Sequence, residues 1–430
     1  MSKSLNIGIA GLGTIGGGTF KLLMEQAESI ERRSGRAVRL VAVAEPDASK
    51  MEEAEKIGIR CYTDALPMAA DDGIDVVVEL IGGSDGIAKK LCETAIANAK
   101  HVVTANKAMV AHHGTALAVA AEDAGVSFAY EAAVAGGIPI IKSLREGLAG
   151  NSIERVYGIL NGTCNFILSA MSDQGREFED VLQECQELGY AEADPSFDID
   201  GIDTAHKLAI LASVAFGGEV NFDAVHVEGI RHISPMDMQF AAELGYRIKL
   251  LGIASVRDDG LEQRVHPCMV PIAAPIAHVA GSLNAVVADG GFVDTLVQEG
   301  YGAGAGPTAS AVAADIIDIA RGLKVPTFGV PADQLKTIPP VPMERHYGAY
   351  YIRLMVVDKP GVFADIASAL KNHAVSMESV IQRTRDPGEA VPVVMTLHET
   401  EETAMVQALD EIAAVGAVVE EPRMIRIESL

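Results

Sequence analysis

The chain has 430 residues, of which 49% are apolar, and it carries a formal net charge of −25. This length predicts two or three domains with enough apolar side chains for real cores. The negative charge argues against a surface that binds nucleic acid or an anionic membrane, and no uncharged apolar run reaches the ~18 residues of a spanning helix.

The N-terminal residues lead straight into a strand, without the pattern of a signal peptide. The five cysteines are scattered, and none belongs to a Cys-x-x-Cys pair. They indicate free thiols and a cytoplasmic location.

Short apolar strands alternate with helices in the first third of the chain. Strands are predicted over 5–10, 39–45, 75–81, 101–104 and 126–130, and helices from about 19 and over 90–99. This alternation predicts a doubly wound parallel α/β sheet, a Rossmann-type dinucleotide-binding domain over residues 1–134.

A glycine fingerprint, Gly11-x-Gly13-Thr14-Ile15-Gly16, lies between the first strand and the first helix. The glycines allow a tight turn and a close approach of a pyrophosphate to the helix N-terminus. A glycine-rich packing turn is the alternative. Glu45 ends the second strand, where a carboxylate binds a ribose hydroxyl and favours NAD, although Lys50 and Lys56 lie nearby in sequence.

Two further segments lie where ligands bind in such sheets. Lys107 follows the strand 101–104 at its carboxyl end, and a solvated surface lysine is the alternative interpretation. Residues 131–139 form an apolar loop with one carboxylate, whose carbonyls could bind a hard cation or which could simply be a turn between domains.

Residues 135–307 are predicted to form a second, α+β domain. Strands are expected over 151–160, 250–256 and 263–272, and helices over 178–188 and 203–216, while 161–165 are expected to form a turn. A glycine-rich loop over 300–306 precedes a helix over 308–322 that we expect to pack on the first domain. Residues 325–348 contain five prolines and predict a linker.

The segment 189–207 is rich in carboxylates and ends on Lys207 at the start of an apolar helix. Helical spacing places Asp203 and Lys207 on one face, one turn apart. A lysine held among carboxylates beside a substrate is a candidate proton donor. An acidic loop followed by a surface ion pair is the alternative interpretation.

The tail, residues 349–430, predicts a separate unit in the order βαββαβ. Strands are expected over 350–357, 375–384, 391–398 and 417–427, and helices over 362–372 and 401–414. This order is typical of a ferredoxin-like fold.

Taken together, the motifs Thr104-Ala-Asn-Lys107, Glu131-Ala-Ala-Val-Ala-Gly-Gly-Ile-Pro139, Asn161-Gly-Thr-Cys-Asn165 and Gly189-Tyr-Ala-Glu-Ala-Asp-Pro195 resemble those of homoserine dehydrogenases with a C-terminal ACT regulatory domain. The resemblance covers essentially the whole chain. It implies reversible NAD- or NADP-dependent reduction of L-aspartate 4-semialdehyde to L-homoserine, on the route to threonine, methionine and isoleucine.

The resemblance also implies that residues 135–307 serve substrate binding, catalysis and dimerisation, and it implies roles for particular residues. Lys207 matches the proton donor, and Lys107 matches a lysine that contacts cofactor and substrate. The other matched residues are Glu192, Asp198 and Asp203 for the substrate; Gly189, Gly302 and Gly304 for the cofactor; and Glu131, Val134, Gly136 and Ile138 for Na⁺.

In the tail, Asp358, Pro360 and Gly361 resemble an ACT effector loop, with L-threonine as the expected effector; a degenerate domain that only pairs subunits is the alternative. The family analogy suggests a dimer or tetramer. Where many relatives have an arginine for the 2′-phosphate of NADP, this chain has Glu45 and Asp47, so NAD and NADP both stay open.

Two other functions compete with this one. A regulatory protein that senses a dinucleotide and an amino acid would need the fingerprint and the tail, but not both Lys107 and Lys207. Another semialdehyde or amino-acid dehydrogenase would not need the segment from Glu192 to Lys207. The presence of all these residues favours the homoserine dehydrogenase.

Overall fold

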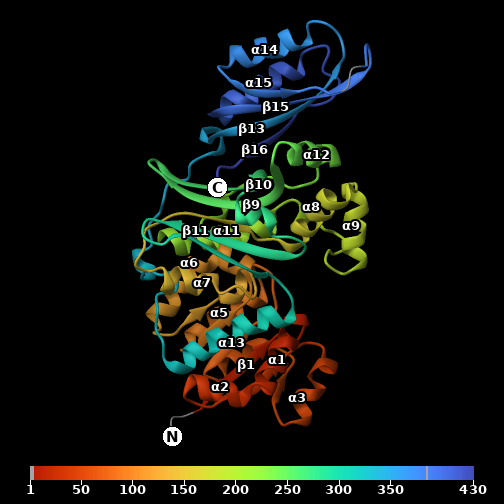
Figure 1. Ribbon diagram of the computed structural model, residues 1–430. Helices are drawn as coiled ribbons and strands as arrows, with labels where there is room; N and C mark the ends of the chain where they lie inside the picture. Colours follow the sequence, from red (N-terminus) through yellow and green to blue (C-terminus); the bar gives the residue numbers. More distant parts are fainter. Residues whose placement is uncertain (1–3, 384–385) are drawn as a thin grey trace.

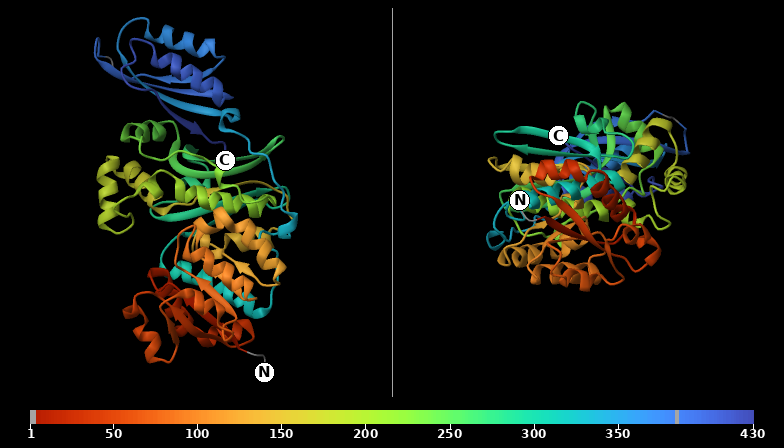
Figure 2. Two further views of the ribbon diagram at one scale, coloured as in Figure 1. Left: turned by 180° about the vertical axis from the view of Figure 1, so that it is seen from behind. Right: turned by 90° about the horizontal axis from the view of Figure 1, so that it is seen from below.

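The computed structural model describes residues 4–383 and 386–430, which form three stacked layers (Figure 1). A parallel-sheet domain lies at the N-terminal end, a mixed-sheet domain in the middle, and a small α/β domain at the other end. The view from behind shows the same order, with residues 322–346 running along the side of the middle layer (Figure 2). Within the described ranges, no helix is long and apolar enough to cross a membrane.

Six parallel strands form the N-terminal sheet in the order β3-β2-β1-β4-β5-β6. The order reverses between β1 and β4, so the crevice at their carboxyl ends is the place where such sheets bind dinucleotides. The strands are β1 (Leu5–Ala10), β2 (Val38–Ala44), β3 (Arg60–Tyr62), β4 (Val76–Glu79), β5 (His101–Thr104) and β6 (Phe128–Ala129). The helices of this layer are α1 (Thr14–Glu25), α2 (Ala27–Ser34), α3 (Glu52–Lys56), α4 (Ala65–Ala70), α5 (Ile87–Ala97) and α6 (Lys107–Asp123).

Helix α13 (Ala305–Arg321) packs on this layer although it follows the middle domain in sequence. Its buried Val312 and Ile316 share an apolar core with Ile7 and Ile9 of β1. Because the chain crosses back here, the glycine-rich segment before α13 lies at the junction of the first two domains.

The middle domain is a mixed sheet in the order β12-β11-β7-β9-β10, with β8 paired to β10. Its helix α11 (Ile202–Phe216) is buried along most of its length, between the sheet and α6. The strands are β7 (Ile153–Ile159), β8 (His226–Val227), β9 (Tyr246–Arg257), β10 (Gly260–Pro271), β11 (Leu283–Gly290) and β12 (Asp294–Tyr301). The other helices are α7 (Ile140–Lys142), α8 (Gly162–Gln174), α9 (Phe178–Glu187), α10 (Ser196–Ile199) and α12 (Pro235–Glu243).

The C-terminal domain has the βαββαβ order predicted from the sequence. Its strands pair in the order β16-β13-β15-β14. The elements are β13 (Tyr347–Val357), α14 (Val362–Asn372), β14 (Met377–Ile381), β15 (Ala390–Glu401), α15 (Glu402–Ala413) and β16 (Arg423–Ile427). Strand β16 also pairs in parallel with β10, through Cys268–Arg426 and Met269–Ile427. The sheets of the middle and C-terminal domains are therefore continuous.

The fold class predicted from the sequence is confirmed, but several elements differ. Residues 162–174, expected to begin as a turn, form α8, because Asn161 caps the helix through the N–H of Cys164. The hairpin β11–β12 was not predicted. Strand β16 starts at Arg423 rather than at 417, and residue 384, the expected end of one strand, lies outside the described residues. Within the segment predicted to be a linker, Phe328 is fully buried.

Candidate active site

The site is centred on Asp203, whose carboxylate is shared by two lysines from different domains. Lys207 Nζ lies 2.8 Å from Asp203 Oδ2, one turn along α11, and Lys107 Nζ lies 2.9 Å from Oδ1. Lys107 begins α6, directly after β5, as its position at the carboxyl end of a strand suggested. The N-terminal domain thus supplies one lysine of the pair, and the middle domain supplies the other.

Lys207 is held by two hydrogen bonds. It is 7% exposed and donates to the Leu160 carbonyl oxygen at 2.7 Å as well as to Asp203. An ammonium group has three N–H donors, so one remains for a substrate oxygen. Lys107 is one-third exposed and lies over the Phe197 ring, 5.5 Å from its centroid.

The two lysines differ in their proton affinity. Burial and the neighbouring charge of Lys107 lower the pKa of Lys207, against the opposing effect of Asp203. For Lys107, burial lowers the pKa, but the carboxylates of Asp203, Asp198 and Glu192 together outweigh burial, so the net shift is upward. Asp203 itself is desolvated, yet the two lysines hold its pKa far below the usual range. Lys207 is therefore the member of the pair better suited to gain and lose a proton.

A third partner of this group, Asn161, was not selected from the sequence. Its Nδ2 donates to Asp203 Oδ2 and to Asp198 Oδ1, both at 2.8 Å, while its Oδ1 caps α8. Burial, followed by the charge of Asp203, raises the pKa of Asp198. Because the role of Asn161 depends on helix capping and on contacts about forty residues away, only its place in a polar motif could have signalled it.

Two further residues of the segment 189–207 that the sequence predicted for the site, Glu192 and Gly189, lie nearer the surface. Glu192 is exposed, and its charge contributes to raising the pKa of Lys107, after the larger effects of burial, Asp203 and Asp198. Gly189 ends the turn after α9 with a left-handed backbone, φ 74°. The structure thus brings Lys107, Asp198 and Asp203 into one group with Lys207, whereas Glu192 and Gly189 lie at its edge.

The glycine fingerprint has the geometry of a pyrophosphate turn. Thr14 and Ile15 begin α1, and a Cβ on Gly16 would lie 1.8 Å from the Gly11 carbonyl oxygen. Glu45 Oε2 accepts a hydrogen bond from the N–H of Leu12 at 2.8 Å, so its carboxylate is tied to the fingerprint. A pocket lined by Gly11, Gly13, Glu45 and Lys50 opens beside it.

Glu131 is buried next to a strained turn. Both of its oxygens accept backbone N–H groups, from Ile141 and Lys142, at 2.9 Å. Burial, followed by the charge of Asp315, raises its pKa to about 7. Ala135 and Gly136 have positive φ, 55° and 49°. Within the described residues no hydrogen bond is found to the carbonyl oxygens of Val134 or Gly136, whereas that of Ile138 accepts from Ile140.

The glycine-rich segment before α13 contacts this turn. The Gly137 N–H donates to the Tyr301 carbonyl at 3.0 Å, and a Cβ on Gly136 would lie 2.5 Å from the Gly302 carbonyl oxygen. Gly304 is the N-cap of α13, and Gly300 and Tyr301, expected in the loop, belong to β12.

In the C-terminal domain, the expected effector loop borders a pocket. Asp358 and Pro360 line it with Gln382 and Pro387, and Gly361 caps α14 with φ 98°. The Asp358 carboxylate accepts the N–H of Asp386 at 2.9 Å.

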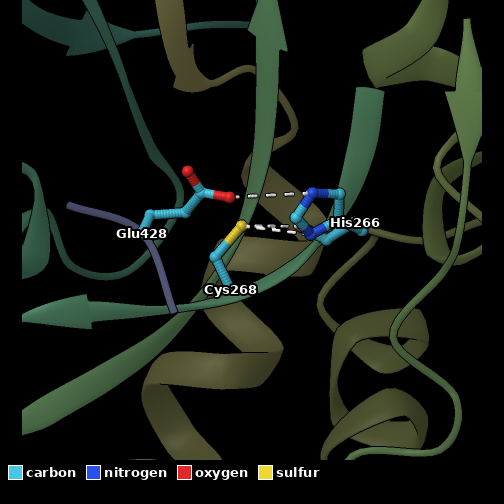
Figure 3. A group of neighbouring side chains, drawn as sticks. All are labelled: His266, Cys268 and Glu428. Atoms are coloured by element: carbon cyan, nitrogen blue, oxygen red, sulfur yellow. Dashed lines mark hydrogen bonds and ion pairs between the residues drawn. The ribbon is translucent and has the colours of Figure 1, made fainter. Parts of the chain in front are cut away.

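One further cluster, His266, Cys268 and Glu428, has side chains close enough to bind a metal ion (Figure 3). Arg264, however, pairs with both oxygens of Glu428 and donates to His266 Nε2 at 2.7 Å. Burial also raises the pKa of the Cys268 thiol well above its ordinary value. A guanidinium thus already neutralises the carboxylate, and the cluster belongs to the ionic contact between the middle and C-terminal domains.

A dinucleotide-binding sheet facing two lysines that share a buried carboxylate, with an ACT-like domain attached, defines a nicotinamide-dependent dehydrogenase of amino-acid metabolism. Family profiles agree: the homoserine dehydrogenase NAD-binding domain matches residues 11–131, homoserine dehydrogenase matches 139–317, and the ACT domain matches 350–417.

Whole-chain relatives identify the family. A homoserine dehydrogenase of Pseudomonas aeruginosa is 44% identical, with all of both chains covered. The crystal structure of one from Thiobacillus denitrificans is 47% identical and superposes with a TM-score of 0.93, covering 99% of this chain and 98% of that one. A hyperthermophilic archaeal homoserine dehydrogenase in complex with NADPH has 25% identity and a TM-score of 0.64, covering 75% of this chain and 99% of that one. The chain belongs to the homoserine dehydrogenase family and is an NAD(P)-dependent oxidoreductase.

Proposed function

We propose that the Lys107–Asp203–Lys207 group catalyses the interconversion of L-aspartate 4-semialdehyde and L-homoserine. The observation that carries the proposal is the buried carboxylate of Asp203, shared by two lysines from different domains at the junction of the first two domains. When bound, the nicotinamide supplies or accepts the hydride.

In this proposal Lys207 is the proton donor. Negative charge develops on the aldehyde oxygen during reduction, and the remaining N–H of Lys207 stabilises it and then transfers its proton. In the oxidation direction, neutral Lys207 accepts the hydroxyl proton. Its lowered pKa makes that neutral form more accessible than it is for an ordinary lysine.

The charges around the lysines suit the two ends of the amino acid. Asp198, Asp203 and Glu192 offer carboxylates for the substrate ammonium group. Lys107 has a raised pKa and stays protonated, so it can bind the substrate carboxylate or the cofactor. Gly189, Gly302 and Gly304 are assigned to the cofactor in the same proposal.

The adenosine end of the cofactor is assigned to the pocket beside the fingerprint. Glu45 offers an acceptor for a ribose hydroxyl, which favours NAD, whereas Lys50 in the same pocket could pair with the 2′-phosphate of NADP. The archaeal relative was solved in complex with NADPH, which supports keeping NADP beside NAD in the proposal.

We assign a monovalent cation, Na⁺, to Glu131 and the carbonyls of Val134, Gly136 and Ile138. The buried carboxylate of Glu131 would supply one negative charge, and the carbonyls of Val134 and Gly136, to which no hydrogen bond is found within the described residues, would supply further oxygen ligands, which suits a hard cation. The contact between Gly137 and Tyr301 would let such an ion support the glycine-rich loop.

The test is homoserine-dependent reduction of NAD or NADP at a pH of about 9, followed by the absorbance of the reduced nicotinamide. Activity with one cofactor supports the reaction and decides what Glu45 and Lys50 select. Folded protein that is inactive with both cofactors would refute the proposal.

We further propose that L-threonine inhibits the enzyme through the pocket at Asp358, Pro360 and Gly361, as feedback in threonine, methionine and isoleucine biosynthesis. The pocket at the start of α14 supports this, because helix N-terminal N–H groups bind carboxylates. Calorimetry with threonine should give saturable binding that Gly361→Val abolishes. Inhibition that survives this substitution would place the effector elsewhere.

A homo-oligomer, dimer or tetramer, completes the proposal. The exposed edge strand β12 and the 94% exposed Phe292 beside it support an interface there, which light scattering would test.

The five free cysteines support a reducing, cytoplasmic location.

A further inference from the structure

Arg426, on β16 of the C-terminal domain, is a buried cation held between two carboxylates. It is 3% exposed. On one side it pairs with Glu402, the first residue of α15, and on the other with Glu228 of the middle domain. Nη1 and Nη2 donate to the two oxygens of Glu228 at 3.0 and 2.8 Å, a bidentate contact that fixes the carboxylate in direction as well as in distance.

Glu228 directly follows β8, and the residues after it lie against α10. Its N–H donates to the Val265 carbonyl at 2.7 Å, which continues the pairing of β8 with β10. Its side chain is one-third exposed and pairs with Arg426 and with His226, whose Nε2 lies 2.7 Å from Oε1. The position of this residue is thus set by β10 and by the C-terminal domain together.

The next residues press directly on α10. The Ile230 N–H donates to the Ile199 carbonyl at 2.9 Å. A Cβ on Gly229 would lie 2.3 Å from that same carbonyl oxygen and 2.6 Å from the Cα of Asp200. This backbone-to-backbone contact leaves no room for α10 to shift toward residues 228–230 without moving them.

On its other side, α10 presents Asp198 to the catalytic group. Asp198 shares the amide of Asn161 with Asp203, and the Asp198 carbonyl lies 3.2 Å from the thiol of Cys164. The contacts therefore run without a gap from Arg426, through Glu228 and the 229–230 backbone, to Ile199 and Asp198.

We propose that Arg426 is a positioning residue for the substrate site: it holds Glu228, and thereby the 228–230 backbone and Asp198, in the arrangement that binds the amino-acid end of the substrate. This inference rests on the proposed function, because it uses the assignment of Asp198 to that end. The C-terminal domain then contributes to basal substrate affinity, with or without an effector.

The structure offers a matched control. Arg353 lies on β13 of the same domain and pairs with Asp237, through Nε to Oδ1 at 2.7 Å and Nη2 to Oδ2 at 3.3 Å; both arginines are buried, and Asp237 is more buried than Glu228. Asp237 belongs to the capping box of α12. Among the described residues, neither Arg353 nor Asp237 forms a hydrogen bond or ion pair with α10 or with residues 228–230. Losing this pair should therefore weaken the contact between the two domains without disturbing the contacts that lead to Asp198.

The test compares Arg426→Gln with Arg353→Gln in the full-length enzyme. Arg426→Gln should raise KM for homoserine about tenfold, while kcat and the Kd for the reduced cofactor change less than about twofold. Arg353→Gln should lower the melting temperature about as much as Arg426→Gln does, but it should leave KM for homoserine unchanged. Glu228→Gln should reproduce the KM change, and the double variant Arg426→Gln/Glu228→Gln should be no worse than either single variant.

If Arg426→Gln does not fold, Arg426→Lys takes its place, because lysine keeps the charge but loses the bidentate contact, and it should give a smaller rise in KM. An unchanged KM for homoserine in the folded Arg426 variant, or an equal rise in the Arg353 variant, would overturn the inference. Wild-type enzyme with no homoserine-dependent activity would instead count against the proposed function.

Discussion

Two buried ionic groups in this chain differ in how their charges are matched. At the junction of the middle and C-terminal domains, each arginine meets carboxylates through several hydrogen bonds: Arg264 with Glu428, and Arg426 with Glu228 and Glu402. At the junction of the first two domains, two lysines share one carboxylate, Asp203.

The difference in charge matching distinguishes ion pairs that hold two domains together from a group that can transfer a proton. Although burial opposes it, the carboxylates raise the pKa of Arg264 and of Arg426 further above an already high value, so neither exchanges a proton. Lys207 has only a share of Asp203, and its pKa is lowered. A cation that is under-compensated, desolvated and able to titrate is suited to proton transfer.

The largest effect is expected from breaking the lysine pair. Lys207→Ala should lower kcat about 10³-fold while the Kd for the cofactor changes little, because the variant removes the proton donor and not the dinucleotide site. Lys207→Arg is the matched control: its charge remains, but it does not release a proton, so it should be nearly as inactive. A kcat within tenfold of wild type for either variant would remove the proton-donor assignment.

Breaking the arginine contact should instead cost stability. Glu428→Gln leaves Arg264 buried without its main partner, and such losses cost about 3–5 kcal/mol of unfolding free energy. The melting midpoint should fall clearly, while kcat per folded molecule stays within about twofold. The double variant Arg264→Met/Glu428→Leu should recover part of the loss, because the desolvated charge is gone. A fall in kcat without a fall in midpoint would contradict this division of roles.

The sequence predicted these two regions unequally. The i, i+4 spacing of Asp203 and Lys207 is local and could be read directly, whereas the place of Lys107 after a strand left a surface lysine open, and only the family resemblance assigned it to the site. The arginine contacts join residues more than 160 positions apart in the case of Arg264 and Glu428, and they depend on β16 pairing with β10, which no periodicity reveals. Asn161 was missed for the same reason, since its partners come from α10 and α11.

Glu131 extends the comparison of buried charges, because among the described residues this buried carboxylate pairs with backbone N–H groups and with no arginine. Its pKa is raised from 4.5 to about 7, mainly by burial, so without a bound cation the folded state holds its proton more tightly than the unfolded state does. The stability present below pH 4.5 should be lost as pH rises through about 7. The total is on the order of 3 kcal/mol.

Added Na⁺ should reverse this loss if the carboxylate is its ligand. In choline buffer the melting midpoint should fall between pH 5 and pH 8, and NaCl should raise it more at pH 8 than at pH 5. Glu131→Gln should show neither the pH trend nor the Na⁺ response. Equal stabilisation by NaCl and choline chloride would mean ordinary ionic strength and not a bound cation.

The smallest effect is expected at the surface, beside the route from Arg426. Arg231 pairs with Asp200, but the side chains are 50% and 40% exposed. Exposed pairs contribute about 0–1 kcal/mol, so Arg231→Ala should change the melting midpoint little and leave KM for homoserine within about twofold. Gly229→Ala, two residues away, should raise KM far more, since its Cβ would meet the Ile199 carbonyl at 2.3 Å. A large rise in KM from Arg231→Ala, with little change from Gly229→Ala, would contradict this order. It would mean that the surface pair of Arg231 and Asp200 positions α10, and not the backbone contact of residues 229–230.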